Sequence, residues 1–179
     1  MEKVFIAIDG GNFYRKLKKL GFSSLAEFDY QGFSKWLAGS SKKSEICYYI
    51  GRIREEPGSS KSKELKSGQD RFLANLANQG ISIKTGYILK SDGGYSEKGV
   101  DVQISVDICM KAVRNEYDRV IIVSSDTDLI PAIKEVQGLK KTVEYIGFAD
   151  SPSFAMIRFS NSRRLLRKED LQPFNKQKP

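Results

Sequence analysis

The sequence contains no histidine. This absence excludes catalysis by a histidine general acid or base, Ser-His-Asp triads, and zinc sites with imidazole ligands. The only two cysteines, Cys47 and Cys109, lie within apolar stretches and lack the spacing of a metal site. Any hydrolytic chemistry must therefore use carboxylates, lysines or a bound metal ion.

Long hydrophobic runs are also missing. No apolar run approaches the roughly 18 residues that a membrane span requires. The residues before Asp9 include a lysine and a glutamate and lack the longer apolar region of a secretory signal. We therefore expect a cytoplasmic protein without a membrane partner, and 179 residues fit one domain of ordinary size.

The charge balance is basic. The chain has 30 lysines and arginines against 22 aspartates and glutamates, a formal net charge of +8. This balance favours polyanionic partners such as nucleic acid over acidic proteins. A charge of this size can also serve solubility alone, so motifs must decide between the two readings.

Five short runs rich in β-branched and aromatic residues have the length of strands. They cover residues 3–8, 45–50, 81–88, 119–124 and 142–147. Segments with helical character lie between them, near residues 12–20, 29–38, 62–79, 100–116 and 126–138. This alternation predicts an α/β fold with a mostly parallel sheet of about five strands. Two segments rich in Gly, Ser and charge, 54–63 and 90–99, are predicted to be loops.

The segment 100–113 fits two secondary structures. Apolar residues at every second position from 100 to 108 alternate with polar ones, as in a half-buried strand. We favour a buried helix, because the apolar character continues to Val113, beyond ordinary strand length, and the same residues also match helical spacing.

Aspartates follow two of the predicted strands. Asp9 follows the run 3–8, and Asp126 and Asp128 follow the run 119–124. In doubly wound sheets, ligands bind at the carboxyl ends of the strands, where adjacent loops part. If these two strands are neighbours, the three carboxylates converge on one crevice. An unpaired acid is costly to bury, which favours a functional role for Asp9, whereas Asp126 could instead be only a helix N-cap.

Two further acids, Asp101 and Asp107, lie in the segment that leads into the second of these strands. Clustered carboxylates repel one another unless a cation neutralises them, and their hard oxygens select Mg²⁺ or Mn²⁺. Six residues of an ideal helix turn through about 240°, so Asp101 and Asp107 cannot both bind one ion from a regular helix. Either Asp101 lies in the preceding loop, or one of the two acts indirectly or at a second ion.

Three sequence blocks follow one another in order. They are IDGGN at 8–12, EKGVDVQISVDICMKA at 97–112 and YDRVIIVSSDTDLIPAI at 117–133. Together they resemble the NYN domain, in the LabA-like branch of the PIN-like nuclease superfamily, from about Val4 to Ile146. The resemblance implies a three-layer α/β/α, Rossmann-like domain, which we expect to occupy residues 1–170, and composition predicts a flexible polar tail at 171–179.

The resemblance also implies a Mg²⁺- or Mn²⁺-dependent endoribonuclease that hydrolyses single-stranded or structured RNA, with DNA left open as a substrate. Five residues match the acidic positions of the family and would bind metal and act in catalysis: Asp9, Asp101, Asp107, Asp126 and Asp128. Asn12 matches the asparagine that follows the first acid and can orient a water or a phosphate oxygen. Ser125 stands where many members have glycine, and Lys98 matches a basic residue that can contact a phosphate.

A nucleic acid also needs a positive rim around such a pocket. The candidates for nucleic-acid contacts are Arg15, Lys16, Arg52, Arg54, Lys98 and Ser125. Each basic residue could equally be a solvated surface charge. The main rival function is a non-catalytic or regulatory nucleic-acid-binding module that keeps the acidic pocket. The oligomeric state stays open, a homodimer included.

Overall fold

The computed structural model describes residues 2–22, 25–41, 43–91 and 94–175. Its strands are β1 (Lys3–Asp9), β2 (Lys43–Arg52), β3 (Ser82–Ser91), β4 (Gly94–Lys98), β5 (Arg119–Val123), β6 (Thr142–Phe148) and β7 (Ser162–Leu166). They form a seven-stranded sheet with the order β4-β3-β2-β1-β5-β6-β7. All neighbouring strands pair in parallel except β3 and β4. The predicted α/β class with a mostly parallel sheet is confirmed, whereas the sheet has seven strands instead of about five.

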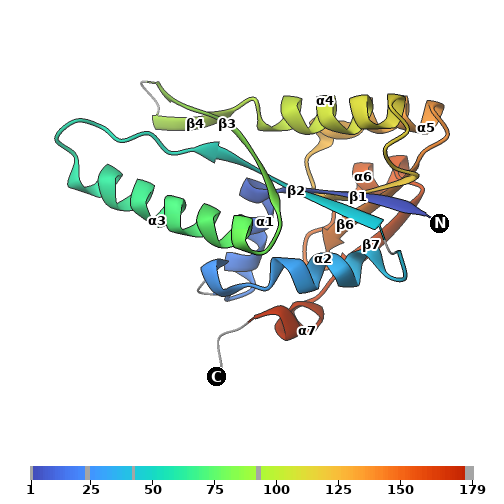
Figure 1. The fold of residues 1–179 in the computed structure, drawn as a ribbon, viewed down its shortest axis with the longest axis horizontal. Helices are drawn as coiled ribbons and strands as arrows, with labels where there is room; N and C mark the ends of the chain where they lie inside the picture. Colours follow the sequence, from blue (N-terminus) through green and yellow to red (C-terminus); the bar gives the residue numbers. More distant parts are fainter. Residues whose placement is uncertain (1, 23–24, 42, 92–93, 176–179) are drawn as a thin grey trace.

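Helices cover both faces of the sheet (Figure 1). One layer contains α4 (Val100–Val113), α5 (Ile130–Gly138) and α6 (Phe154–Phe159). The other contains α1 (Gly10–Lys19), α2 (Tyr30–Ala38), α3 (Ser60–Asn78) and α7 (Lys168–Leu171). Short 3-10 helices are η1 (Leu25–Glu27), η2 (Thr127–Leu129) and η3 (Gln172–Phe174). Within the described ranges, none of the helices combines the length and the apolar character that a membrane crossing requires.

Strand β1 lies at the centre of the sheet and faces both layers. Its side chains alternate between the two faces, as in any strand. Val4, Ile6 and Ile8 join the core under α1, α2 and α3, while Phe5 and Ala7 join the core under α4 and α5. Burial on both faces explains why this run is continuously apolar until Asp9.

The carboxyl ends of β1 and β5 lie side by side. The two strands pair in parallel, with Ile8 opposite Val123, and β2 flanks β1 on the other side, with Tyr49 opposite Asp9. The loops that leave β1 and β5 therefore start from adjacent points on one edge of the sheet. This adjacency brings together the segments that carry Asp9 and Asp126.

The predicted loop at 90–99 is largely a β-hairpin. Strand β3 continues to Ser91, and β4 returns antiparallel beside it, while residues 92–93 lie outside the described residues. Pairing with the edge of β3 satisfies the backbone of a segment whose Gly, Ser and charge content is typical of a loop. The other predicted loop, 54–63, ends at Ser59, whose side chain caps α3 by accepting the N–H of Ser62.

The predicted tail at 171–179 is packed as far as Asn175. Leu171 is fully buried, and the Phe174 ring contacts the rings of Phe28 and Phe33. These apolar side chains hold the segment against α2. The sequence does not reveal this packing, because most residues around them are polar. Residues 176–179 lie outside the described part of the chain, and a domain boundary at residue 170 stays a prediction.

Candidate functional site

Asp9 ends β1 and caps the N-terminus of α1. One carboxylate oxygen accepts the backbone N–H of Asn12 at 2.9 Å, and the other accepts the hydroxyl of Ser124 at 2.7 Å. The residue is only 5% exposed. Burial raises the pKa of Asp9 and the charge of Asp126 adds to the rise, while the two hydrogen bonds and the charge of Arg15 oppose it. A buried carboxylate that is held in place and repelled by a nearby acid is suited to receive a cation.

Ser124 connects Asp9 to Asp126. Its buried hydroxyl donates to Asp9 and accepts the backbone N–H of Asp126 at 3.1 Å. The Asp126 side chain in turn accepts the N–H of Asp128 at 2.9 Å and so caps η2. The capping role considered from the sequence is therefore real, yet the charge of Asp126 still reaches Asp9.

Ser125 anchors the same loop to the neighbouring strand. Its hydroxyl lies 2.9 Å from the hydroxyl of Tyr145 on β6, which also accepts the N–H of Ser153 at 3.1 Å. Tyr145 is fully buried. The Ser125 side chain thus ties the loop to the core, and a contact of Ser125 with RNA stays a prediction.

The two acids of α4 have different surroundings. Asp101 lies in the first turn of the helix, after Gly99 in a left-handed conformation (φ 83°), so it is not in the preceding loop. Asp107 accepts the Tyr49 hydroxyl at 2.9 Å and the Gln103 side-chain amide at 2.9 Å, and Lys84 approaches to 4.0 Å. Since α4 is regular, the two carboxylates leave it in different directions. Asp107 is held toward β2 and β3.

Among the residues that the structure describes, no three acidic or cysteine side chains are close enough to surround a metal ion. Asp9 and Asp126 are instead a pair whose charges interact. Proteins commonly hold Mg²⁺ through one or two carboxylates, with waters and substrate phosphates as the other ligands. The hard oxygens of this pair are of the kind that Mg²⁺ or Mn²⁺ prefers, and metal binding by any of the five acids, Asp9, Asp101, Asp107, Asp126 and Asp128, stays a prediction.

Three hydroxyl groups that organise the site are not among the residues predicted from the sequence. They belong to Ser124, Tyr49 and Tyr145. Ser124 has a recognisable signal, because a polar residue between an apolar strand and an acid must find a buried partner. The two tyrosines have no such signal, because an aromatic residue within a strand is expected to be part of the hydrophobic core.

Two basic residues of α1 have distinct positions. Arg15 is exposed, and its charge acts on Asp9. Lys16 donates to the backbone carbonyl of Ser151 at 3.0 Å, and its ammonium lies 5.9 Å from the centre of the Phe148 ring. Arg15 therefore belongs to the surroundings of Asp9, whereas Lys16 ties α1 to the segment after β6. Lys98 is exposed at the end of β4, where its backbone carbonyl lies against Gly86.

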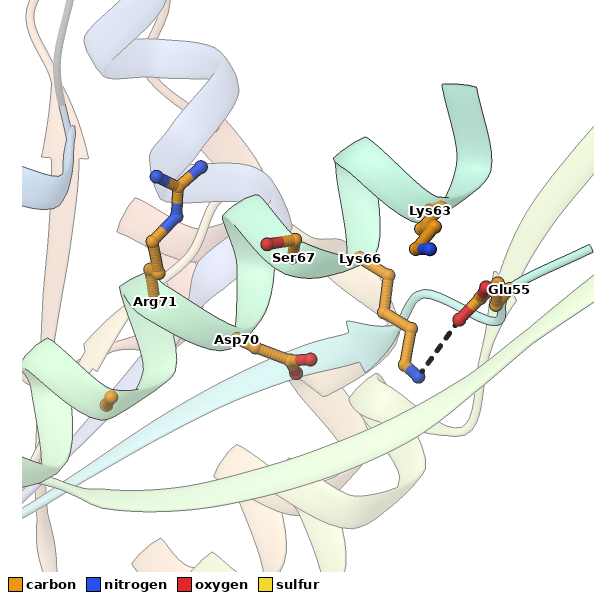
Figure 2. Close-up of a pocket in the computed structure, with 7 residues that line it drawn as sticks. Glu55, Lys63, Lys66, Ser67, Asp70 and Arg71 are labelled. Atoms are coloured by element: carbon orange, nitrogen blue, oxygen red, sulfur yellow. Dashed lines mark hydrogen bonds and ion pairs between the residues drawn. The ribbon is translucent and has the colours of Figure 1, made fainter. Parts of the chain in front are cut away.

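The remaining predicted basic contacts, Arg52 and Arg54, lie at and after the end of β2. Arg52 forms an ion pair with Asp70 of α3 at 2.8 Å, and Arg54 is exposed. Beside them an open groove of 440 Å³ runs along α3, lined by Glu55, Lys63, Lys66, Ser67, Asp70, Arg71 and Ala74. Figure 2 shows Lys66 reaching to Glu55, at 3.5 Å, and Arg71 pointing the other way from α3. Side chains of both charges line this groove, and the five predicted acids are not among its lining residues. The groove is therefore separate from the candidate metal site.

Comparisons with known proteins agree with this architecture. A family model described as NYN domain matches residues 3–163. A crystal structure of a protein of unknown function from Vibrio parahaemolyticus is similar in fold, with 24% sequence identity, a TM-score of 0.70, and 95% of each chain covered. A C-S lyase from Staphylococcus hominis shares 10% identity over 77% of this chain and 40% of its own, with a TM-score of 0.23, too low for any structural argument. No curated protein matches the chain.

Proposed function

The chain belongs to the NYN domain family of the PIN-like, nuclease-type superfamily, and from this premise we propose that it is a Mg²⁺- or Mn²⁺-dependent endoribonuclease. The observation that carries the proposal is the buried Asp9 carboxylate at the end of β1, beside the charges of Asp126 and Arg15. We further propose that the chain belongs to the LabA-like branch of the family.

In this proposal, Asp9 and Asp126 hold the metal ion. When bound, such an ion activates a water for attack on phosphorus and neutralises charge on the leaving oxygen. The N–H of Asn12 and the hydroxyl of Ser124 fix the Asp9 carboxylate, so little reorganisation is needed when the cation arrives. Asp101, Asp107 and Asp128 assist the pair as further acids.

Several residues are proposed to position the RNA. The side chain of Asn12 orients a water or a phosphate oxygen, and Arg15, next to Asp9, contacts a phosphate of the substrate. Lys98 and Ser125 are candidates for further contacts at the pocket. Lys16 and Arg52 are weaker candidates, because they already bind Ser151 and Asp70. Arg54, which is exposed after the end of β2, is a further candidate. The substrate is single-stranded or structured RNA.

The proposal is tested by incubating the purified chain with circular single-stranded RNA, which an exonuclease cannot degrade. We expect cleavage with Mn²⁺ or Mg²⁺ and none with EDTA. Asp9→Asn removes the buried charge and should lower the rate at least about 100-fold, equivalent to about 2.7 kcal/mol of transition-state stabilisation. Mn²⁺ should also raise the thermal midpoint of the wild type but not of Asp9→Asn, because only the folded wild type binds the ion.

The matched control is Asp29→Asn. Asp29 caps α2 by accepting the N–H of Gly32 at 2.9 Å, as Asp9 caps α1. Asparagine caps helices about as well as aspartate, so this variant separates capping from metal binding. It should cleave RNA at the wild-type rate. Cleavage by Asp9→Asn at that same rate would refute the catalytic role.

One observation favours a second function, a nucleic-acid-binding module without turnover. No third acid joins Asp9 and Asp126 in the part of the chain that is described. For this alternative we expect RNA binding that weakens with salt, and intact RNA under every divalent metal. Cleavage that depends on Asp9 would exclude it.

A further inference from the structure

Phe154 exposes an apolar ring at the start of α6. Among the side chains that the structure describes, no large apolar one is more exposed than Phe154, at 80%. Met156, two positions and about 200° around the helix from it, is fully buried, so α6 packs through Met156 and turns Phe154 to solvent. Single exposed apolar residues are ordinary on a protein surface, so the place of this ring in the fold must decide whether it has a function.

The segment that carries Phe154 leaves the sheet at the edge that also carries Asp9 and Asp126. Strand β6 runs parallel to β5 and ends at Phe148, and residues 149–153 connect it to α6. Since β1 and β5 are parallel as well, the loops after β1, β5 and β6 all start from this one edge. Phe154 therefore lies on the same side of the molecule as the candidate metal site.

Tyr145 joins this segment to the loop of Asp126. A side chain on Gly147 would clash with the Tyr145 hydroxyl, so the glycine lets the ring lie along the strand toward its carboxyl end. There the hydroxyl lies 2.9 Å from the hydroxyl of Ser125 and accepts the N–H of Ser153 at 3.1 Å. One hydroxyl group thus connects the residue before Asp126 with the residue before Phe154.

Helix α1, which begins directly after Asp9, holds the same segment. Lys16 donates to the backbone carbonyl of Ser151 at 3.0 Å, and Lys19 forms an ion pair with Asp150 at 2.8 Å. Ser153 then caps α6 by accepting the N–H of Met156. The backbone that presents the Phe154 ring is therefore fixed relative to both acids, which lowers the entropic cost of binding a ligand there.

We propose that Phe154 stacks on an unpaired base of an RNA strand that passes Asp9 and Asp126. The inference rests on the proposed function, because it assumes that RNA binds at this edge of the sheet. One base can cover one aromatic ring, whereas a protein partner would need a much larger apolar surface. Arg158 is exposed one turn after Phe154 and supplies a positive charge for an adjacent phosphate. The RNA must be single-stranded at this point, because bases within a duplex are stacked on one another.

The experiment measures binding of an oligouridine of about ten nucleotides to the full chain in EDTA, where the nuclease proposal predicts no cleavage. Phe154→Ala should raise the dissociation constant at least about fivefold, because the stacking of one base is lost. Phe154→Leu keeps an apolar side chain without a ring and should bind as weakly, whereas Phe154→Tyr should bind like the wild type. The control is Val113→Ala, because Val113 is 64% exposed at the end of α4, near the amino end of β5, and its loss should leave the affinity unchanged.

A fluorescence measurement reports stacking itself. Phe154→Trp adds an indole to a chain whose own tryptophan, Trp36, lies on α2 in the other helix layer. Oligouridine should quench the fluorescence of Phe154→Trp and leave that of the wild type unchanged, since bases stack on exposed aromatic rings. An RNA duplex without ends that fray should not quench it, because its bases are already stacked.

Several outcomes would overturn the inference. They are a wild type that binds no oligouridine, equal affinities of the wild type and Phe154→Ala, full affinity in Phe154→Leu, and a Phe154→Trp variant that binds oligouridine without quenching. Circular dichroism checks that each variant is folded. A wild type that binds RNA through Phe154 but cleaves none would refute the nuclease proposal alone, whereas cleavage with unchanged affinity in Phe154→Ala would refute the stacking alone.

Discussion

At the scale of single residues, Asp9 combines a structural and a proposed chemical role. Its carboxylate caps α1 and accepts the Ser124 hydroxyl, so the fold uses both of its oxygens. Burial nevertheless raises its pKa, which means that the ionised form is less favoured in the folded chain than in the unfolded chain. The protein without metal therefore carries an energetic cost at neutral pH that a bound cation would remove.

That cost can be measured through the pH dependence of stability. Because the folded pKa of Asp9 lies above 3.8, the folded state binds more protons between that pH and its own pKa, and stability falls as pH rises through this window. We expect metal-free Asp9→Asn to melt above the wild type near neutral pH and the difference to shrink toward about pH 4. Calorimetry in EDTA buffers makes the comparison.

Asp29→Asn again supplies the control, since it changes a helix cap in the same way at another helix. Its effect on the thermal midpoint should be small, because asparagine caps helices about as well as aspartate. If Asp9→Asn melts below the wild type both near neutral pH and near pH 4, the hydrogen bonds of the Asp9 carboxylate stabilise the fold by more than the burial of its charge destabilises it.

The acids at strand ends could be predicted, whereas their detailed partners could not. Asp9 and Asp126 follow continuous apolar runs, and a parallel sheet places the ends of neighbouring strands together. Asp107 sits mid-helix, where its direction depends on the helix rotation and on a tyrosine from β2. This tyrosine, Tyr49, is 58 positions from Asp107 in the sequence, so no local sequence pattern predicts the contact.

At the scale of elements, the five central strands could be predicted and the two edge strands could not. Strands β1, β2, β3, β5 and β6 all come from the apolar runs of the sequence. Strands β4 and β7 lie at the edges of the sheet and are rich in polar residues. Edge strands are less covered by neighbouring elements than central strands, so they need fewer apolar residues. The apolar run that identifies a strand in the sequence is therefore weaker at the edges.

The junction between β1 and α1 offers a test at this scale. A Cβ atom on Gly10 would lie 2.6 Å from the backbone oxygen of Tyr49 and would also clash with the buried Tyr48 ring. Gly10→Ala must therefore push α1 away from β2. We expect a loss of about 1–3 kcal/mol in the free energy of unfolding, measured by urea denaturation.

Gly68→Ala is the matched control. Gly68 lies inside α3, and nothing lies within 4 Å of the position of its added Cβ atom. Alanine is the better helix former, so this variant should gain about 0.5–1 kcal/mol. Equal effects at the two glycines would mean that the Gly10 contacts do not constrain the junction.

At the scale of the whole molecule, the net charge of +8 should appear in the salt dependence of RNA binding. Asp9→Asn can be used to prevent cleavage during the measurement. For about four phosphate contacts, a fourfold rise in salt should weaken binding of single-stranded RNA about 50-fold. Adding Arg15→Ala should reduce the slope of log affinity against log salt by about 0.7, because one contact is lost.

Arg163→Ala serves as the comparison, since it removes an exposed positive charge from β7 at the edge of the sheet. Its slope should equal that of the parent. If Arg15→Ala and Arg163→Ala change the slope equally, the net positive charge of the protein attracts RNA without specific contacts, and Arg15 does not contact a phosphate.

Strand β7 has a consequence for how copies of the chain can assemble. It forms one edge of the sheet and carries two consecutive arginines, Arg163 and Arg164. Arg164 is bound to the buried Glu144, and Arg163 extends into solvent. Positive charge along an open edge disfavours the addition of another chain's strand, since like charges would then stack across the new ladder. Growth into a continuous intermolecular β-structure is thereby discouraged.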